Sequence, residues 1–180
     1  MKNKIVIALF SALLIFSQDA EAGIMKFKSA DIKSGGNIKE AQVFNSFGCN
    51  GLNKSPQLSI SGVPKGTKSL AITMYDPDAP TGSGWWHWIV YDIDPTVTEI
   101  PAGVEKISSN AVMGRNDYGD YKYGGPCPPV KTRHRYVFTL YALDVEKLDV
   151  PEGASAAMIG FNLNAHTIKK EEFSGFYSRK

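Results

Sequence analysis

Short apolar stretches separated by turn-forming residues recur along most of the chain. Residues 69–75 and 86–93 are rich in β-branched and aromatic side chains, so they predict two well-buried strands. Residues 135–143 alternate regularly between two faces, which predicts a strand in the interior of a sheet. The pattern is that of a protein built mainly of β-strands. Shorter segments with strand character lie at residues 24–28, 58–61 and 171–177.

One segment near the C-terminus follows a helical period instead. Within residues 154–168, apolar side chains recur every three or four positions. Pro151 and Glu152 suit the start of a helix, the proline through its fixed φ and the glutamate through its interaction with the helix dipole. We therefore expect one late helix packed on a sheet in a single domain, without alternating strand–helix units.

Two long segments show neither period. Residues 44–56 form one, and residues 114–131, rich in glycine, proline and tyrosine, form the other. Loops of this length inside a small domain usually carry function or cover another part of the protein. We expect both of them to border the functional site.

The first residues predict a cleavable secretory signal peptide, residues 1–22, followed by one domain at residues 23–180. Lys2 and Lys4 precede an apolar run, residues 5–16, that is shorter than the roughly 20 residues needed to span a bilayer. Small residues before Gly23 suit cleavage after Ala22. The prediction is a periplasmic or secreted protein without a stable membrane anchor. The alternative is an N-terminal anchor that is never cleaved.

Charge and cysteine content narrow the function further. The formal net charge is only +2, which does not predict a nucleic-acid groove or a polybasic membrane patch. Cys49 and Cys127 are the two cysteines, and an exported chain with this even count predicts one intramolecular disulfide. Because the two lie far apart in sequence and outside any Cys-x-x-Cys unit, we expect no metal site and no cofactor.

The most unusual chemistry lies in residues 76–88. Asp76 and Asp78 flank a proline that restricts the backbone, and glycines then permit a tight loop. All three tryptophans follow, with His87 between two of them. A rigid polar loop between two apolar strands is typical of the mouth of a pocket. The alternative is an ordinary hairpin, with aspartates that cap turns and tryptophans that belong to the core.

Several motifs resemble the phosphatidylethanolamine-binding protein family, and above all an exported member of its bacterial, Raf-kinase-inhibitor-like branch. They are Asp-Pro-Asp-Ala-Pro at residues 76–80, Gly-Trp-Trp-His-Trp at residues 84–88, and Pro128-Pro129 followed by His134-Arg135-Tyr136. The resemblance implies a large central antiparallel β-sheet beside a smaller sheet, with a helix of the C-terminal region packed on it.

The resemblance also implies a small surface pocket for phosphate or a phosphorylated head group. One wall departs from the family pattern, because Gly125-Pro126-Cys127-Pro128-Pro129 stands where many members have Gly-Pro-Pro, and its register is open by a residue or two. The ligand-binding residues expected from the motifs are Asp76, Asp78, Trp85, His87, Gly125, Pro126, Cys127, Pro128, Pro129, His134 and Tyr136.

The chemistry of these residue types fits an anion. An imidazolium donates hydrogen bonds from both ring nitrogens, and Asp76 near an imidazole would favour its charged form. Tyr136 adds a hydroxyl donor on the same strand face as His134. We therefore expect an anion between His87 and His134. The third histidine, His166, is interpreted as structural.

The function predicted from the sequence is non-enzymatic binding of a small phosphorylated ligand. One alternative is a hydrolase that uses Asp76, His87 and His134 as acid–base groups or metal ligands. No serine or cysteine lies in an activating motif, which argues against it. The other alternative is a secreted inhibitory factor that binds a protein partner through the pocket rim.

Overall fold

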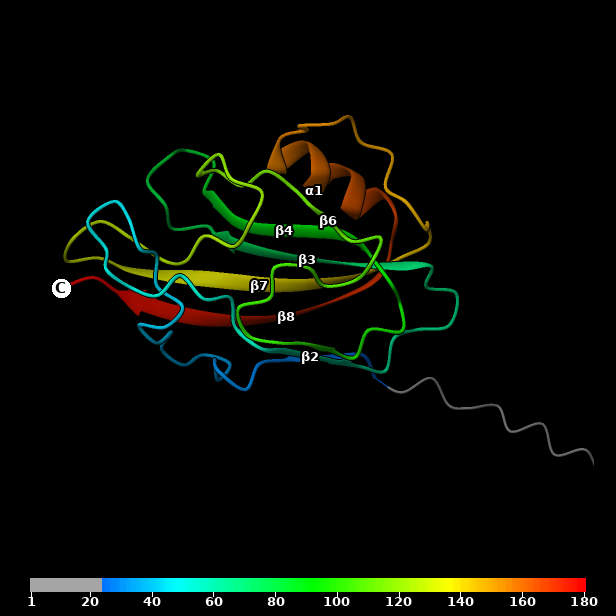
Figure 1. Cartoon of the computed structure of the whole chain (residues 1–180), viewed down its shortest axis with the longest axis horizontal. Helices are drawn as coiled ribbons and strands as arrows, with labels where there is room; N and C mark the ends of the chain where they lie inside the picture. The colour runs from blue at the N-terminus through cyan, green and yellow to red at the C-terminus, as the bar shows by residue number, and fades with distance from the viewer. Residues whose placement is uncertain (1–23) are drawn as a thin grey trace, which may run out of the picture.

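A computed structural model describes residues 24–180 as two antiparallel sheets and one helix (Figure 1). The predicted signal peptide and its cleavage site after Ala22 lie outside the described residues. The smaller sheet consists, in spatial order, of β1 (Lys26–Lys28), β2 (Leu58–Ser61) and β5 (Glu99–Ile100). The larger sheet consists of β6 (Val112–Met113), β4 (Trp85–Ile93), β3 (Ser69–Asp76), β7 (Arg133–Leu143) and β8 (Thr167–Ser178).

The large sheet forms the middle of three layers (Figure 1). The main core fills the space between the two sheets, where Met74, Trp88 and Phe138 are almost completely buried. A second core lies between the large sheet and helix α1 (Ala156–Ala165), around Ile89 and Ile159. Because both faces of the large sheet are covered, its strands β3 and β7 carry long apolar runs. The predicted mainly β fold with two sheets and a packed helix is confirmed.

Helix α1 is shorter than the predicted range of residues 154–168. Ser155 is its N-cap, with a side-chain oxygen that accepts from the Met158 backbone N–H at 3.2 Å. At the other end, Thr167 already pairs with Leu143 of β7. The last residues of the predicted helix therefore belong to β8, which starts before the expected residue 171 because pairing with β7 outweighs the local helical period.

The polar residues at the start of β7 alternate between its two faces. His134 and Tyr136 are buried, whereas Arg133 and Arg135 point away from them and are exposed. Within residues 24–180, no helix has the length and apolar character required to cross a membrane.

Candidate functional site

The site lies at one end of the large sheet, where three strands bring polar residues together. Asp76 ends β3 and pairs with Trp85, which begins β4. On its other side, β3 pairs with β7 up to Tyr75 and Val137. Asp76 is the next residue, so it lies level with Tyr136 and diagonal to His134, within reach of a cross-strand contact.

His87 reaches this site through a β-bulge. Met74 pairs with Trp88, but Tyr75 pairs with Trp86, so β4 contains one extra residue between the two pairs, and that residue is His87. An extra residue reverses the alternation of side chains on the two sides of the bulge. As a result, Trp88 packs in the main core while His87, its neighbour in sequence, lines the site next to that core.

His134 forms a buried pair with Asp76. Its Nδ1 lies 2.7 Å from Asp76 Oδ2, and both side chains are almost inaccessible to solvent. The second carboxylate oxygen, Oδ1, accepts the backbone N–H of Asp78 at 2.8 Å. Burial raises the pKa of Asp76, and the hydrogen bond and charge of His134 oppose that rise. The carboxylate therefore orients the His134 ring, and the ring presents Nε2 as its second nitrogen.

His87 has a different hydrogen-bond partner, a backbone carbonyl. Its Nδ1 lies 2.7 Å from the Gly124 carbonyl oxygen. Complete burial lowers the pKa of His87 to about 4, and the carbonyls of Gly124 and Gly125 oppose this only partly. Of the two imidazoles, Asp76 therefore orients that of His134, whereas His87 is bonded to a neutral carbonyl.

Two buried donors near these rings have no partner among the described residues. The Tyr136 hydroxyl and the Trp85 indole Nε1 are both inaccessible to solvent and make no hydrogen bond within residues 24–180. Burial raises the pKa of Tyr136, so its hydroxyl stays protonated and remains a donor. A buried donor without a partner is costly, and a ligand or a bound water would satisfy it.

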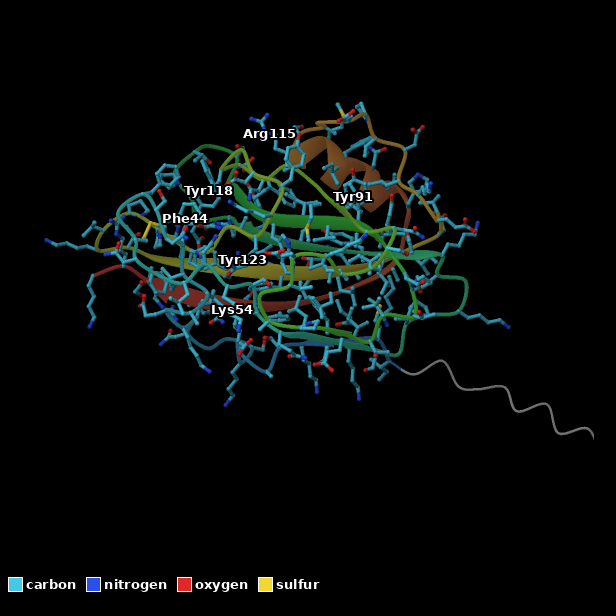
Figure 2. All side chains as sticks on the ribbon, viewed as in Figure 1. Phe44, Lys54, Tyr91, Arg115, Tyr118 and Tyr123 are labelled. Atoms are coloured by element: carbon cyan, nitrogen blue, oxygen red, sulfur yellow. A yellow bond between two sulfur atoms is a disulfide. The ribbon has the colours of Figure 1, made fainter. Side chains whose placement is uncertain are left out.

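The opposite wall of the site is built from the two long loops. Phe44 and Phe47, from the first loop, pack against Tyr118 of the second, with ring centroids of Phe44 and Tyr118 4.1 Å apart (Figure 2). Gly125 lies directly against the first loop, where a Cβ atom would overlap the Gln42 carbonyl and lie 2.7 Å from the Phe44 nitrogen. Only glycine permits this close approach of the two backbones.

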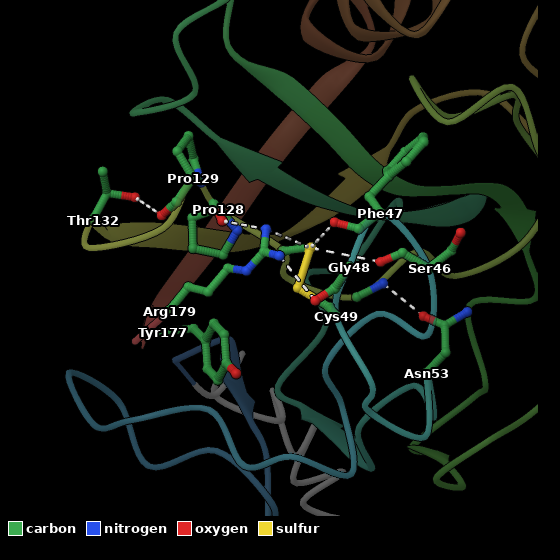
Figure 3. Close-up of a disulfide and its surroundings, with 12 residues drawn as sticks. Ser46, Phe47, Gly48, Cys49, Asn53, Pro128, Pro129, Thr132, Tyr177 and Arg179 are labelled. Carbon is green, nitrogen blue, oxygen red and sulfur yellow. Dashed lines mark hydrogen bonds between the residues drawn. A yellow bond between two sulfur atoms is a disulfide. The ribbon is translucent and has the colours of Figure 1, made fainter.

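A disulfide between Cys49 and Cys127 joins these loops, with the two Cα atoms 6.0 Å apart (Figure 3). The predicted disulfide is confirmed. Arg179 also holds the two loops together. Its guanidinium donates to the Gly48 carbonyl at 2.8 Å and to the Pro128 carbonyl at 3.5 Å. A further link runs from the Gly125 N–H to Asn53 Oδ1 at 2.7 Å. The loop wall is thus fixed by a disulfide and by individual hydrogen bonds, without a ladder of paired strands.

The strands and loops enclose a cavity of about 170 Å³. This volume is below the roughly 300 Å³ at which pockets for drug-sized ligands begin, so it suits a small ion or head group. The cavity is lined by Phe47, Asp76, Ala79, Pro80, Thr81, Trp85, His87, Tyr118, Cys127, Pro128, Pro129, His134 and Tyr136.

Three predicted ligand residues lie outside this lining. Asp78 accepts the Arg135 backbone N–H at 2.7 Å and so ties the β3–β4 loop to β7. Gly125 and Pro126 contact the first loop, where the Pro126 carbonyl accepts the Phe44 N–H at 3.0 Å. These three residues support the walls. Phe47 and Tyr118 line the cavity but were not predicted, although both lie in the two long segments without a regular period.

No group of three or more His, Cys, Asp or Glu side chains within residues 24–180 is placed to hold a metal ion. Asp76 and His134 form a pair, and His87 is bonded to a carbonyl.

The fold and the site define a mainly β protein with a small cavity that has a buried polar end. Comparisons with known proteins identify its family. The family model for phosphatidylethanolamine-binding protein matches residues 28–178. The UPF0098 protein YbcL of Escherichia coli is 44% identical over 182 residues, which cover 98% of each chain. The chain belongs to the phosphatidylethanolamine-binding protein family.

Solved structures agree with this assignment. The crystal structure of E. coli YbcL, described as a new member of the mammalian family, matches with a TM-score of 0.83 and 46% identity, over 87% of this chain and 99% of that chain. A putative phosphatidylethanolamine-binding protein homologue from Chlamydia trachomatis matches with a TM-score of 0.75 and 36% identity, over 87% and 98% of the two chains.

Proposed function

We propose that the protein is a non-enzymatic binding protein whose cavity takes phosphate-type anions, either phosphate itself or small phosphorylated molecules and head groups. The observation that carries this proposal is the buried His134–Asp76 pair at the end of the cavity, beside the unpartnered Tyr136 hydroxyl. A protonated His134 offers the ligand a charged donor, and Tyr136 offers a neutral one. The family is named for a phospholipid whose head group contains a phosphoryl group.

The energetic argument favours an anion over a neutral ligand. Hydrogen bonds in which one partner is charged contribute roughly 1.5–3 kcal/mol each, about twice the contribution of neutral ones. The carboxylate of Asp76 lies 2.7 Å from His134 Nδ1, so an imidazolium formed at this position would be paired and its burial tolerated. Tyr136 gains a partner only when a ligand or a water enters.

The nucleophiles near the cavity support binding over hydrolysis. Cys127 is held in the disulfide with Cys49. The Thr81 hydroxyl already donates to the Gly84 carbonyl, and its oxygen has no histidine as hydrogen-bond partner. An acid–base pair without an activated nucleophile or a metal ion would need to activate water by itself. We therefore propose binding without turnover.

A protein-partner role is a second candidate, because the rim of the cavity has apolar side chains in solvent. Phe47 is 67% exposed and Val130, next to the Pro129 wall, is 54% exposed. A partner retained on immobilised protein in the presence of saturating phosphate would favour this role. Release of the same partner by phosphate would place it in the cavity and favour the anion site.

Calorimetric titration with phosphate and with phosphoethanolamine tests the anion site. We expect His134→Ala to weaken binding by about tenfold to a hundredfold, because a charge-assisted hydrogen bond is lost. His166→Ala is the matched control, since His166 also pairs with a carboxylate, Asp144 at 2.9 Å, but lies outside the cavity. Equal affinity in wild type, His134→Ala and His87→Ala would refute the proposal.

We also propose that the protein is exported and that residues 1–22 are removed, as in the exported bacterial branch of the family. The disulfide supports this, since such bonds persist in oxidising compartments. The intact mass of protein from the periplasm or medium decides the question. A mass that corresponds to a chain beginning at Met1 would show that no cleavage occurs.

A further inference from the structure

The two histidines of the cavity differ in the nitrogen that each can offer to a ligand. A carbonyl oxygen accepts hydrogen bonds and never donates them, so Nδ1 of His87 must carry the hydrogen in its contact with Gly124. In a neutral imidazole the other nitrogen is then unprotonated. With its pKa lowered to about 4 by burial, His87 is neutral at physiological pH. Its Nε2 is therefore a hydrogen-bond acceptor.

Nothing in the described protein satisfies this acceptor. His87 lines the cavity, and no hydrogen bond within residues 24–180 involves its Nε2. The titratable groups that line the cavity with His87 are Asp76, Tyr118, His134 and Tyr136. Tyr118 donates to the Gly125 carbonyl at 3.0 Å, and Asp76 is bonded to His134. A donor for His87 must therefore come from the ligand or from water.

The cavity thus contains donors on one side and an acceptor on the other. When protonated, the His134 ring that Asp76 orients donates from Nε2, and Tyr136 carries an unpartnered hydroxyl, so these two groups can face the oxygens of an anion as donors. His87 faces the same anion as an acceptor. A fully deprotonated oxyanion would place one of its oxygens against the His87 lone pair, and that contact is repulsive.

We propose that His87 makes the cavity selective for oxyanions that still carry a proton, with Nε2 accepting a hydrogen bond from a P–OH group while His134 and Tyr136 donate to the other oxygens. The inference rests on the anion site proposed above and adds its specificity. Phosphate and phosphate monoesters carry such a proton, whereas sulfate and phosphate diesters carry none. An intact phospholipid, which is a diester, would therefore lack this contact.

Sulfate is the sharpest competitor, because it is tetrahedral like phosphate and at least as negative at neutral pH. Simple electrostatic attraction would bind the two ions about equally or favour sulfate. A lost hydrogen bond to a charged ligand is equivalent to a factor of about ten to a hundred in affinity. We expect calorimetric titration of the wild-type protein at neutral pH to give a preference for phosphate of that size.

Methyl phosphate and dimethyl phosphate extend the test. At pH 5 both are monoanions, but only the monoester has a P–OH group, so we expect it to bind at least tenfold more tightly. The second pKa of a phosphate monoester is about 6, so by pH 8 methyl phosphate has lost its proton. Inorganic phosphate keeps one throughout. The affinity for methyl phosphate, divided by the affinity for phosphate, should therefore fall between pH 5 and pH 8. This ratio is measured because a change in the charge of the protein affects both ligands and cancels.

A variant assigns the selectivity to His87. In His87→Gln, a side-chain amide replaces the ring and can rotate to donate, so the preference for phosphate over sulfate should fall towards one. If this variant does not fold, the wild-type ligand series still decides. Equal binding of phosphate and sulfate, with a pH-independent ratio for methyl phosphate, would overturn the selectivity while the anion site stands. Absence of binding by every anion would remove the site and the selectivity together.

Discussion

The two halves of the cavity are built on different principles. The strand-built half comprises Asp76, His87, His134 and Tyr136, whose positions follow from the register of β3, β4 and β7. The loop-built half comprises Phe47, Tyr118 and residues 127–129, held by a disulfide, Arg179 and a few hydrogen bonds. The first half supplies the chemistry and the second supplies the shape.

This difference shows how the functional side chains of a small site are held in a fixed geometry. Side chains on paired strands are fixed by many backbone hydrogen bonds, so groups such as the His134–Asp76 pair keep their geometry. Loops have no such ladder and depend on single links. Changes to the loop half should therefore act mainly on stability and access, whereas changes to the strand half should act mainly on affinity and pH dependence.

Removal of the disulfide should give the largest effect on stability. The bond joins residues 78 apart in sequence, and chain-entropy models assign roughly 4–5 kcal/mol to a loop of this length. We expect the Cys49→Ser, Cys127→Ser double variant to lose stability of that order in urea denaturation. Reductant should destabilise the wild type and leave the double variant unchanged. An unaltered denaturation midpoint in the double variant would show that the loop half needs no covalent link.

The buried neutral His87 should give the strand half a distinct pH dependence. Its pKa is about 4 in the folded protein against 6.5 for an ordinary histidine, so the unfolded chain binds more protons between these values. The stabilisation from the neutral ring is complete above pH 6.5 and is lost as the pH falls towards 4, by about 3 kcal/mol in total.

The measurement is the free energy of unfolding of wild type and His87→Gln at several values between pH 7 and pH 4.5. We expect the wild type to lose more stability than the variant over this range. Parallel curves for the two proteins would contradict a buried neutral imidazole at this position.

Tyr136→Phe should separate affinity from stability. The Tyr136 hydroxyl has no partner in the described protein, so its removal should leave the free energy of unfolding unchanged or slightly increased. Phosphate affinity should fall by about tenfold, equivalent to about 1.4 kcal/mol, because one donor to the anion is lost. Thermal denaturation and calorimetry on the same sample test both parts. A large loss of stability with unchanged affinity would indicate a structural hydroxyl.

Phe47→Ala should have the smallest effect. Phe47 lies at the cavity wall, but two thirds of its surface is exposed and it offers no polar group to an anion. We expect stability to change by less than about 0.5 kcal/mol and phosphate affinity to stay within experimental error. A tenfold loss of phosphate affinity would mean that the loop half contributes directly to binding, and the division between chemistry and shape would fail.

Much of the fold could be predicted from the sequence, because the spacing of apolar residues and the local composition indicate individual strands and helices. The strands around residues 69–75, 86–93 and 135–143 were predicted within two residues of their ends. The helix was predicted too long, because residues 167 and 168 follow a helical apolar spacing but pair with β7. A local pattern cannot report such competition with a distant strand.

The sequence predicted the residue types of the site more completely than it predicted their arrangement in space. Motifs identified Asp76, His87 and His134, but strand alternation could not show that a bulge turns His87 into the cavity. The sequence also could not decide which imidazole pairs with Asp76 and which bonds to a backbone carbonyl. Tyr118 escaped notice because it lies in a segment without a regular period and enters the wall only through packing on Phe44.

Arg179, which directly follows β8, ties the loop wall of the cavity to the last strand of the large sheet. Its guanidinium holds Gly48, its backbone N–H donates to the Thr132 carbonyl at 3.2 Å, and its carbonyl accepts from the Lys131 N–H at 2.9 Å. These contacts join residues far apart in sequence, and such long-range contacts are slow to form. We therefore expect the loop wall of the cavity to be completed late in folding, after β8 has paired with β7.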